Sequence, residues 1–282
     1  MGRIFSCSYI LLSAGEYGGS GELLAIKKSK KLSTSLQPAS LGKPKDGYLH
    51  FGQRAMIINE KTGCFLCTDA GDTTEKVAGL SFACATGPCP QSCVRNVFQL
   101  CRPRQDDNFG SQTIVHFGQP VSIKMDPQLS ETCPVNGEGS DRFLHSELIS
   151  PTASAKISNF QQVLFCPAPS ANAEWKIFHV DPRIRFETEG SPVPANAPVV
   201  IKHARTGQML ASSPRMKYIN DFGVEYEVYC KSYLRTNKTQ NLIAESLGRT
   251  TSDIDSKQQE AENNWMILTV TEDGGSRDPF SD

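Results

Sequence analysis

The sequence predicts an all-β fold, a β-trefoil-like barrel of three unequal four-strand repeats with an N-terminal arm and long inserted loops. Three observations predict it. The motif HFGQ occurs twice, at residues 50–53 and 116–119. A short strand-like run follows each of three openings, at residues 56–58, 121–123 and 199–201. Each copy closes on a strand led by an aromatic residue of the predicted repeat core, Phe98, Trp175 or Trp265. Such a repeat indicates that several units share one core.

Each repeat opens with a tight turn. Gly52 and Gly118 occupy the third position of HFGQ, and Asn196 takes that position in the third copy, where PANA replaces HFGQ. A second turn follows the first strand in two copies, at Gly63 and Gly207 of two Thr-Gly pairs. Glycine and asparagine supply the positive φ that these turns require. We therefore predict fold-defining turns at these five residues.

The strands after the turns complete the unit. A strand carrying a leucine follows the second turn and the aromatic-led strand ends the copy, which makes about four strands per repeat. One such unit cannot bury a face of its own, so three units must share a core. Closing them on one another also removes the exposed strand edges that promote aggregation. A β-sandwich whose strands are similar by accident is the alternative.

The repeats organise most of the chain into one domain. We predict a β-trefoil-like domain at residues 46–270, with repeats at about 46–103, 112–182 and 190–270. Residues 1–45 form an N-terminal arm that is partly disordered or a short helix, and residues 271–282 form an acidic flexible tail. The 282 residues, 38% of them hydrophobic, are enough for a large shared core.

The number of residues between the opening turn and the closing aromatic residue increases from the first copy to the third, which indicates insertions. Residues 71–92, 126–141 and 150–173 are rich in Gly, Pro, Ser and other turn residues, and we expect them to be irregular connections. Residues 221–233 alternate well enough to form a strand, whereas residues 241–263 are charged and only weakly periodic. Long loops in a compact domain are usually functional or disordered. They are the predicted contact surfaces.

The arm contains a basic run. Residues 21–36 are expected to form a short amphipathic helix or an extended arm, and a solvated tail is the favoured interpretation of the basic run. Its lysines are the candidate partner contacts: Lys27, Lys28, Lys30 and Lys31. Residues 1–6 fit the myristoylation pattern and residues 4–14 resemble a short signal-peptide core, but polar residues interrupt the apolar run, so neither is predicted.

Charge and hydropathy narrow the function classes. The formal net charge is only −1, which argues against attachment to nucleic acid or membrane by bulk charge. No stretch approaches the roughly 20 apolar residues that a membrane span needs. We therefore expect no nucleic-acid partner and no membrane span.

Cysteine is abundant, with ten residues. Cys64 and Cys67 are a close pair, but Cys84, Cys89 and Cys93 follow at wider spacings than the two tight pairs of a structural zinc site. Cysteine is also a common small core residue. We predict no metal and no other cofactor; zinc measurement on the purified chain decides the alternative.

Enzyme motifs are not recognisable in this sequence. It contains no HExxH, no GxSxG and no phosphate-binding loop. His50 and His116 fill the same position in two repeats, as a requirement of the fold would place them. We predict no enzymatic activity, no catalytic residues and no small-molecule substrate.

Several motifs carry a family resemblance. The run DGYLHFG at residues 46–52, the run RFETEGSPVPANA at residues 185–197 and the run NNWM at residues 263–266 resemble the cilia- and flagella-associated protein 161 family. The similarity extends through all three copies, from about residue 23 to 270. The first residues, MGRIFSCSYILL, differ from the longer acidic arm of that family.

The resemblance implies a non-enzymatic microtubule inner protein, which lines the A-tubule lumen of ciliary and flagellar doublet microtubules and supports axoneme stability and cilium motility. The implied location is the axoneme of the cilium, within the cytoskeleton and cytoplasm. The implied partners are the tubulin lattice and neighbouring microtubule inner proteins.

Two other functions remain open. A trefoil can bind carbohydrate, and Asp69 and Asp72 follow the Thr-Gly turn of the first copy. No aspartate closely follows the Thr-Gly turn of the third copy. A trefoil can also be an intracellular adaptor module. Glycan binding or a location at the endoplasmic reticulum distinguishes these alternatives from a ciliary protein.

Overall fold

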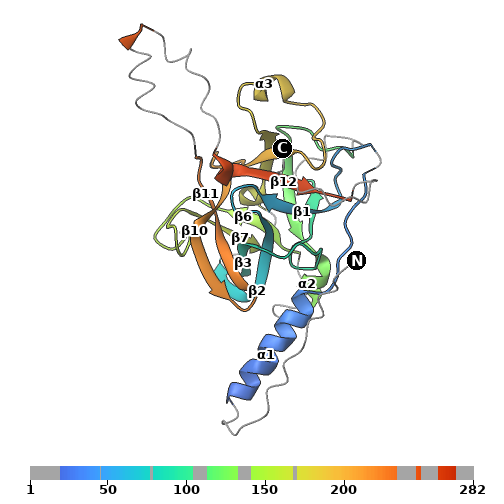
Figure 1. Ribbon diagram of the computed structural model, residues 1–282, viewed down its shortest axis with the longest axis vertical. Helices are drawn as coiled ribbons and strands as arrows, with labels where there is room; N and C mark the ends of the chain where they lie inside the picture. Colours follow the sequence, from blue (N-terminus) through green and yellow to red (C-terminus); the bar gives the residue numbers. More distant parts are fainter. Residues whose placement is uncertain are drawn as a thin grey trace, which may run out of the picture.

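The computed structural model describes residues 20–44, 46–76, 79–103, 113–132, 141–167, 170–233, 246–248 and 260–270. These residues form twelve strands in one connected set of antiparallel pairings, with few helices (Figure 1). The prediction of an all-β fold is confirmed. The first part of the arm, residues 1–19, and the predicted tail at residues 271–282 lie outside the described residues.

The strands in chain order are β1 Arg54–Asn59, β2 Cys64–Lys76, β3 Gly79–Gly87, β4 Phe98–Cys101, β5 Pro120–Met125, β6 Phe143–Ser146, β7 Gln161–Cys166, β8 Trp175–His179, β9 Pro198–His203, β10 Leu210–Asn220, β11 Gly223–Cys230 and β12 Asn264–Leu268. The helices are α1 Ser20–Ser35, α2 Pro127–Thr132 and α3 Arg185–Thr188, with short 3₁₀ turns η2 Ala171–Ala173 and η3 Ala261–Asn263.

Six strands pair in a closed ring. The first and last strand of each copy pair with each other, as β1 with β4, β5 with β8 and β9 with β12. Neighbouring copies are joined by the pairs β4 with β5, β8 with β9 and β12 with β1. The same connection therefore occurs three times, as the repeat in the sequence predicts.

The other six strands form three hairpins, β2 with β3, β6 with β7 and β10 with β11. Short pairings between β3 and β7, β7 and β11, and β11 and β3 tie the hairpins to one another. The β10–β11 hairpin is long and its tip, residues 220–223, extends toward α1 (Figure 1). This hairpin sets one wall of the candidate site.

The repeated HFGQ motif is a structural turn. The backbone N–H of His50 donates to Oε1 of Gln53 at 3.0 Å, and His116 donates to Gln119 at 3.1 Å. The glutamine side chain thus caps the turn from within the motif in both copies, which explains why the motif repeats. Neither histidine is required to do chemistry for the motif to recur.

The predicted turn residues all have positive φ. The angles are 83° at Gly52, 62° at Gly63, 79° at Gly118, 58° at Asn196 and 71° at Gly207. Three of them also tie the opening of a copy to its end, because their backbone N–H groups donate to the carbonyls two residues after the closing aromatics. These bonds are Gly52 to Leu100, Gly118 to Ile177 and Asn196 to Ile267.

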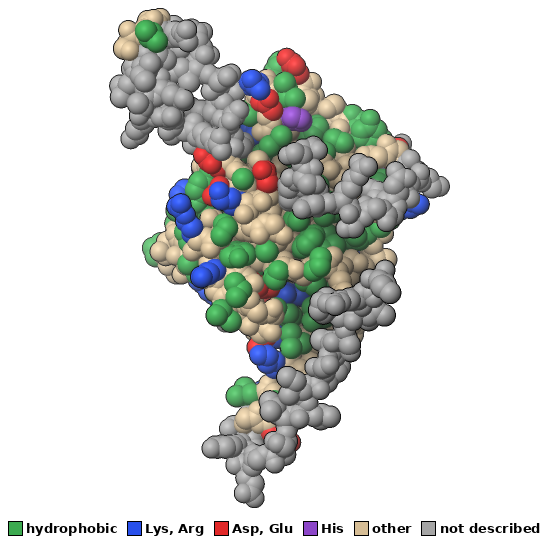
Figure 2. All heavy atoms as spheres, viewed as in Figure 1, with side chains coloured by type: hydrophobic (Ala, Val, Ile, Leu, Met, Phe, Trp, Pro, Cys, Tyr) green, Lys and Arg blue, Asp and Glu red, His purple; other side chains and the backbone are tan. Residues whose placement is uncertain are grey.

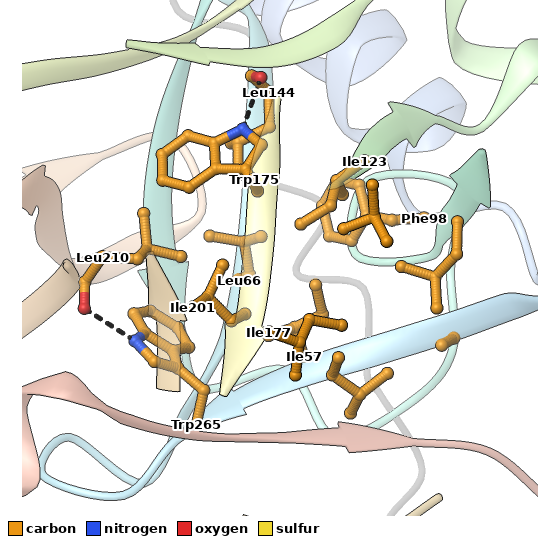
Figure 3. Packing of buried hydrophobic residues seen from close by; sticks show 14 of the residues in the cluster. Ile57, Leu66, Phe98, Ile123, Leu144, Trp175, Ile177, Ile201, Leu210 and Trp265 are labelled. Atoms are coloured by element: carbon orange, nitrogen blue, oxygen red, sulfur yellow. Dashed lines mark hydrogen bonds between the residues drawn. The ribbon is translucent and has the colours of Figure 1, made fainter. Parts of the chain in front are cut away.

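The three closing aromatic residues lie in the shared core. Phe98, Trp175 and Trp265 are all fully buried, and Figure 3 shows them around the same apolar centre. Each tryptophan donates its indole N–H to a carbonyl of a hairpin strand, Trp175 to Leu144 at 2.8 Å and Trp265 to Leu210 at 3.0 Å. The aromatic residues therefore connect the ring of six strands to the hairpins.

The three segments predicted to be irregular contain regular structure. Residues 71–92 contain the end of β2 and all of β3, residues 126–141 contain α2, and residues 150–173 contain β7. Glycine and threonine in residues 71–92, and serine, alanine and proline on both sides of β7, are typical of loops. Pairing with neighbouring strands stabilises these strands and overrides the local composition. The strand predicted within residues 221–233 is present as β11.

A substitution at Gly52 tests the turn. A Cβ at this position would meet no atom within 4 Å, so only the positive φ opposes a side chain. We expect Gly52→Val to lower the free energy of unfolding by about 1–3 kcal/mol in urea titration. Gly52→Asn is the matched control and should cost clearly less, because Asn196 has a positive φ at the equivalent position of the third copy. Equal stability of wild type and the valine variant would contradict the turn assignment.

Candidate partner-binding surface

Helix α1 is the most exposed element beside the β domain. Its sequence, SGELLAIKKSKKLSTS, is rich in leucine and lysine, which favour helix, and Glu22 lies in the first turn, where the helix dipole favours an acid. The helix ends at Ser35, three residues before Pro38. The helical form expected for the arm is therefore present, and it projects from one end of the molecule (Figure 1).

Lys31 anchors the helix to the β domain. Its Nζ lies 2.8 Å from Oδ1 of Asp69 in β2 and 3.0 Å from Oδ2 of Asp221 at the β10–β11 tip. The Asp69 side chain is 4% exposed, so this carboxylate depends on its partners inside the protein. The end of α1 is held as well, because the N–H of Arg95 donates to the carbonyl of Ser35.

The electrostatics of this contact favour the bound helix. Burial alone lowers the pKa of Lys31, but the hydrogen bonds and charges of Asp69 and Asp221 outweigh it, and the pKa is raised above its ordinary value of 10.5. The same ion pair with Lys31 lowers the pKa of Asp221. Lys28 adds a weaker, exposed contact to Asp221 at 3.4 Å.

A groove lies between the projecting part of α1 and the β domain. Its volume is about 630 Å³, and it is open to solvent. Apolar and small residues share its lining with lysines and one aspartate: Leu24, Ala25, Lys27, Lys28, Lys30, Lys31, Thr34, Ala70, Gly71 and Asp221. We call this feature the α1 groove. Its composition suits a partner with an apolar side chain and acidic neighbours.

The four predicted contact lysines fall into two groups. Lys31 and Lys28 are engaged by acids of the same chain, so they hold the helix in place. Lys27 and Lys30 are exposed, and neither forms an ion pair with another described residue. Lys27 and Lys30 are therefore the lysines whose charge is available to a partner.

A buried ion pair supports the hairpin tip that closes the groove. Nη2 of Arg95 lies 2.8 Å from Oε1 of Glu225 in β11, and both side chains are at most 2% exposed. The Arg95 guanidinium also lies over the ring of Phe222, 3.5 Å from its centroid. Asn220 donates to the other carboxylate oxygen of Glu225 at 2.6 Å. These contacts of Arg95 and Glu225 hold the hairpin tip in place.

The cysteines are core residues in this part of the chain. Cys67 and Cys84 are buried, and burial raises the pKa of both thiols well above the ordinary value. A raised pKa keeps a thiol protonated and unreactive. The described residues hold no group of three His, Cys, Asp or Glu side chains that fits a metal ion.

Two surface features of the protein were not predicted from its sequence. The acids that anchor α1, Asp69 and Asp221, lie far from it in the chain, and no local pattern indicates the contact. Phe186 in α3 is 88% exposed. The sequence contains a sign of this exposure. Phe186 lies between the closing strand of the second copy and the opening of the third, where the repeat has no core position.

Removing the Lys31 side chain should loosen α1. In Lys31→Ala the buried Asp69 loses its cation, and we expect α1 amides to exchange hydrogen at least about tenfold faster, corresponding to a local loss of about 1–3 kcal/mol. Since the pKa of Lys31 is raised, the contact is complete below pH 10.5 and weakens as the pH rises through the folded-state pKa. Lys27→Ala is the matched control. Unchanged exchange in Lys31→Ala would show that this ion pair does not hold the helix.

The model of the cilia- and flagella-associated protein 161-like domain matches residues 55–242, about two thirds of the chain. The chain belongs to this family. The match confirms the family predicted from the motifs at residues 46–52, 185–197 and 263–266, and with it the predicted association with cilia and flagella.

Curated members of the family align with most of the chain. The cilia- and flagella-associated protein 161 of zebrafish (Danio rerio) is 28% identical over 236 residues, covering 78% of this chain and 74% of the relative. The mouse (Mus musculus) protein of the same name is 27% identical over 265 residues, covering 88% and 78%. The chain therefore shares most of the length of these family members.

Solved structures of low sequence identity share the fold. An SDF2-like protein from Arabidopsis thaliana superposes with a TM-score of 0.52 at 14% identity, over 78% of this chain and 94% of that one. A Caenorhabditis elegans protein of unknown function superposes with a TM-score of 0.53 at 13% identity, over 80% and 99%. At these identities the likeness concerns the fold alone. No helix within the described ranges is both long and apolar enough to cross a bilayer.

Proposed function

We propose that this member of the cilia- and flagella-associated protein 161-like family is a non-enzymatic microtubule inner protein. It lies in the A-tubule lumen of doublet microtubules, contacts the tubulin lattice and neighbouring inner proteins, and supports axoneme stability and cilium movement. The observation that carries the proposal is the family match over residues 55–242. The exposed helix and groove beside a closed β domain support it.

The domain is a β-trefoil in this proposal. A ring of six strands tied to three hairpins, with one unit repeated three times, is the arrangement that such a fold requires. The superposition on the Arabidopsis SDF2-like protein supports the same fold. A closed ring with three hairpins offers attachment surfaces on several sides.

The physical properties of the chain suit a lattice component. A net charge of −1 gives no strong long-range attraction to a single partner. Attachment then depends on several modest contacts made together, which a high local concentration strengthens. The α1 helix, held at Lys31 and free at Lys27 and Lys30, is one such contact and docks against the lumenal wall or a neighbouring protein.

The test follows the protein through extraction of the axoneme. A tagged full-length chain expressed in ciliated cells should remain with doublet microtubules after mild salt extraction, and electron cryomicroscopy should show its β domain inside the A-tubule. Lys27→Glu with Lys30→Glu should weaken retention, whereas Arg183→Ala, far from α1, should not. Release of the wild-type chain at the first mild salt step contradicts the proposal. Density showing α1 free in the lumen contradicts its role in attachment.

A further inference from the structure

The α3 end of the molecule presents an exposed aromatic side chain. Phe186 is 88% exposed, the largest exposed fraction among the large hydrophobic residues of the described chain. It lies in α3, in the connection between β8 and β9. A single exposed aromatic residue adds nothing to the core, but such residues are frequent anchors of protein interfaces.

The segment that carries Phe186 is held rigidly. Nε of Arg185 donates to the carbonyl of His179 at 2.7 Å, and its Nη2 donates to Val180 at 3.1 Å. The hydroxyl of Thr188 donates to Ile184 at 2.9 Å. Because these bonds order the segment in the free protein, a partner that binds Phe186 loses little affinity to ordering it.

The available charge around Phe186 is acidic. Glu187 and Glu189 flank it, both are exposed, and neither forms an ion pair with a described residue. The neighbouring cations are occupied, since Arg183 pairs with Asp181 at 2.9 Å and Arg185 binds backbone carbonyls. Figure 2 shows exposed acidic side chains at this end. We call Phe186, Glu187 and Glu189 the α3 knob.

The α1 groove has the complementary chemistry. It offers apolar lining at Leu24 and Ala25 and the free charges of Lys27 and Lys30. An aromatic ring fits a cavity of about 150 Å³, so a groove of about 630 Å³ has room for Phe186 and part of the backbone around it. The groove and the knob lie at opposite ends of the long axis of the molecule (Figure 1), so one copy cannot join its own two sites.

We propose that the α3 knob of one copy docks in the α1 groove of a second copy, with Phe186 against Leu24 and the two glutamates against Lys27 and Lys30. The two surfaces differ, so the contact is head-to-tail and each added copy leaves one groove and one knob free. The product is an open linear array. This inference concerns the purified chain and does not depend on the ciliary role.

The contact is weak in dilute solution. A buried phenylalanine contributes about 150–250 Å², and a stable interface usually buries at least about 1,200 Å². Association therefore requires high protein concentration, or copies already aligned by a lattice, which raises their effective concentration. Opposite charges at the rim also make the association weaken as salt increases.

Sedimentation velocity of the full chain tests the proposal over roughly a hundredfold range of protein concentration, up to about 1 mM, where weak contacts form. The sedimentation coefficient of wild type should rise with concentration, whereas Phe186→Ala should stay monomeric. Lys27→Glu/Lys30→Glu and Glu187→Lys/Glu189→Lys should each be monomeric alone and associate when mixed, because each supplies the charge that the other lacks. Circular dichroism should show all variants folded.

Mixing the two charge-reversal variants distinguishes this contact from non-specific association. Lys28 and Lys31 are left unchanged in the variants because they hold α1 in place. A wild-type coefficient that does not change with concentration overturns the proposal and assigns the groove to another occupant. Association that survives Phe186→Ala, or a mixture that remains monomeric, overturns it as well.

Discussion

Glu225→Ala should lower the free energy of unfolding by about 3–5 kcal/mol, because it leaves a buried guanidinium without its anion. The Glu225 side chain is 0% exposed and that of Arg95 is 2% exposed. Arg95 keeps its bonds to the carbonyl of Thr68 and to Sγ of Cys67, but these neutral acceptors do not balance its charge.

Urea titration of two further variants makes the result specific. Arg95→Met with Glu225→Leu removes both charges and should recover most of the lost stability, since replacing a buried ion pair by apolar side chains is often neutral. Asp181→Ala, which breaks the exposed pair with Arg183, should leave the unfolding midpoint nearly unchanged. A Glu225→Ala midpoint equal to that of Asp181→Ala would show that the buried pair carries no net stabilisation.

Glu225→Ala should also loosen the α1 groove. Glu225 accepts a hydrogen bond from Asn220 at the hairpin tip, and the backbone N–H of Arg95 donates to the carbonyl of Ser35 at the end of α1. Loss of the pair therefore loosens both walls of the α1 groove. We expect α1 and the tip to lose hydrogen-exchange protection before the ring of six strands does.

The repeat made much of this fold predictable from the sequence. Turns at Gly52 and Gly118 follow from local φ requirements, and a pattern found three times carries more information than any single segment. The closing positions at Trp175 and Trp265 are marked because large aromatic residues recur there. Local conformation and recurring pattern are the two properties that sequence reports directly.

The parts that break the repeat were not predictable in the same way. Arg95 and Glu225 are 130 residues apart and occur once, so no periodicity or spacing indicates that they meet. Lys31 lies in a basic run that is typical of a solvated helix, yet Asp221, 190 residues away, binds it. The candidate surface depends on these distant pairs, and the fold must be known before they can be found.

Trp265→Ala should be as damaging as the loss of Glu225, at about 3–5 kcal/mol, because it opens a large cavity in the shared core. The side chain is 0% exposed and lies among strands from several copies (Figure 3). Its indole N–H donates to the carbonyl of Leu210, so the variant also breaks a link between β12 and the β10–β11 hairpin. The free energy of unfolding in urea measures the loss.

Trp265→Phe separates the cavity from the hydrogen bond. The carbonyl of Leu210 still accepts from Nδ2 of Asn263 at 3.1 Å, so no buried acceptor is orphaned. The first repeat already uses Phe98 at the equivalent position, where it stacks on Phe165 with the ring centroids 5.2 Å apart. We therefore expect Trp265→Phe to cost only about 1–2 kcal/mol.

Phe186→Ala is the control for removing an aromatic side chain without opening a cavity. Its ring is 88% exposed, and we expect a change within about 0.5 kcal/mol. A loss in Trp265→Ala no larger than in Phe186→Ala would mean that the three copies do not share one core at this residue. The self-association of the same Phe186→Ala protein is measured by sedimentation velocity. Because this variant is folded and stable, unfolding cannot explain an absence of association.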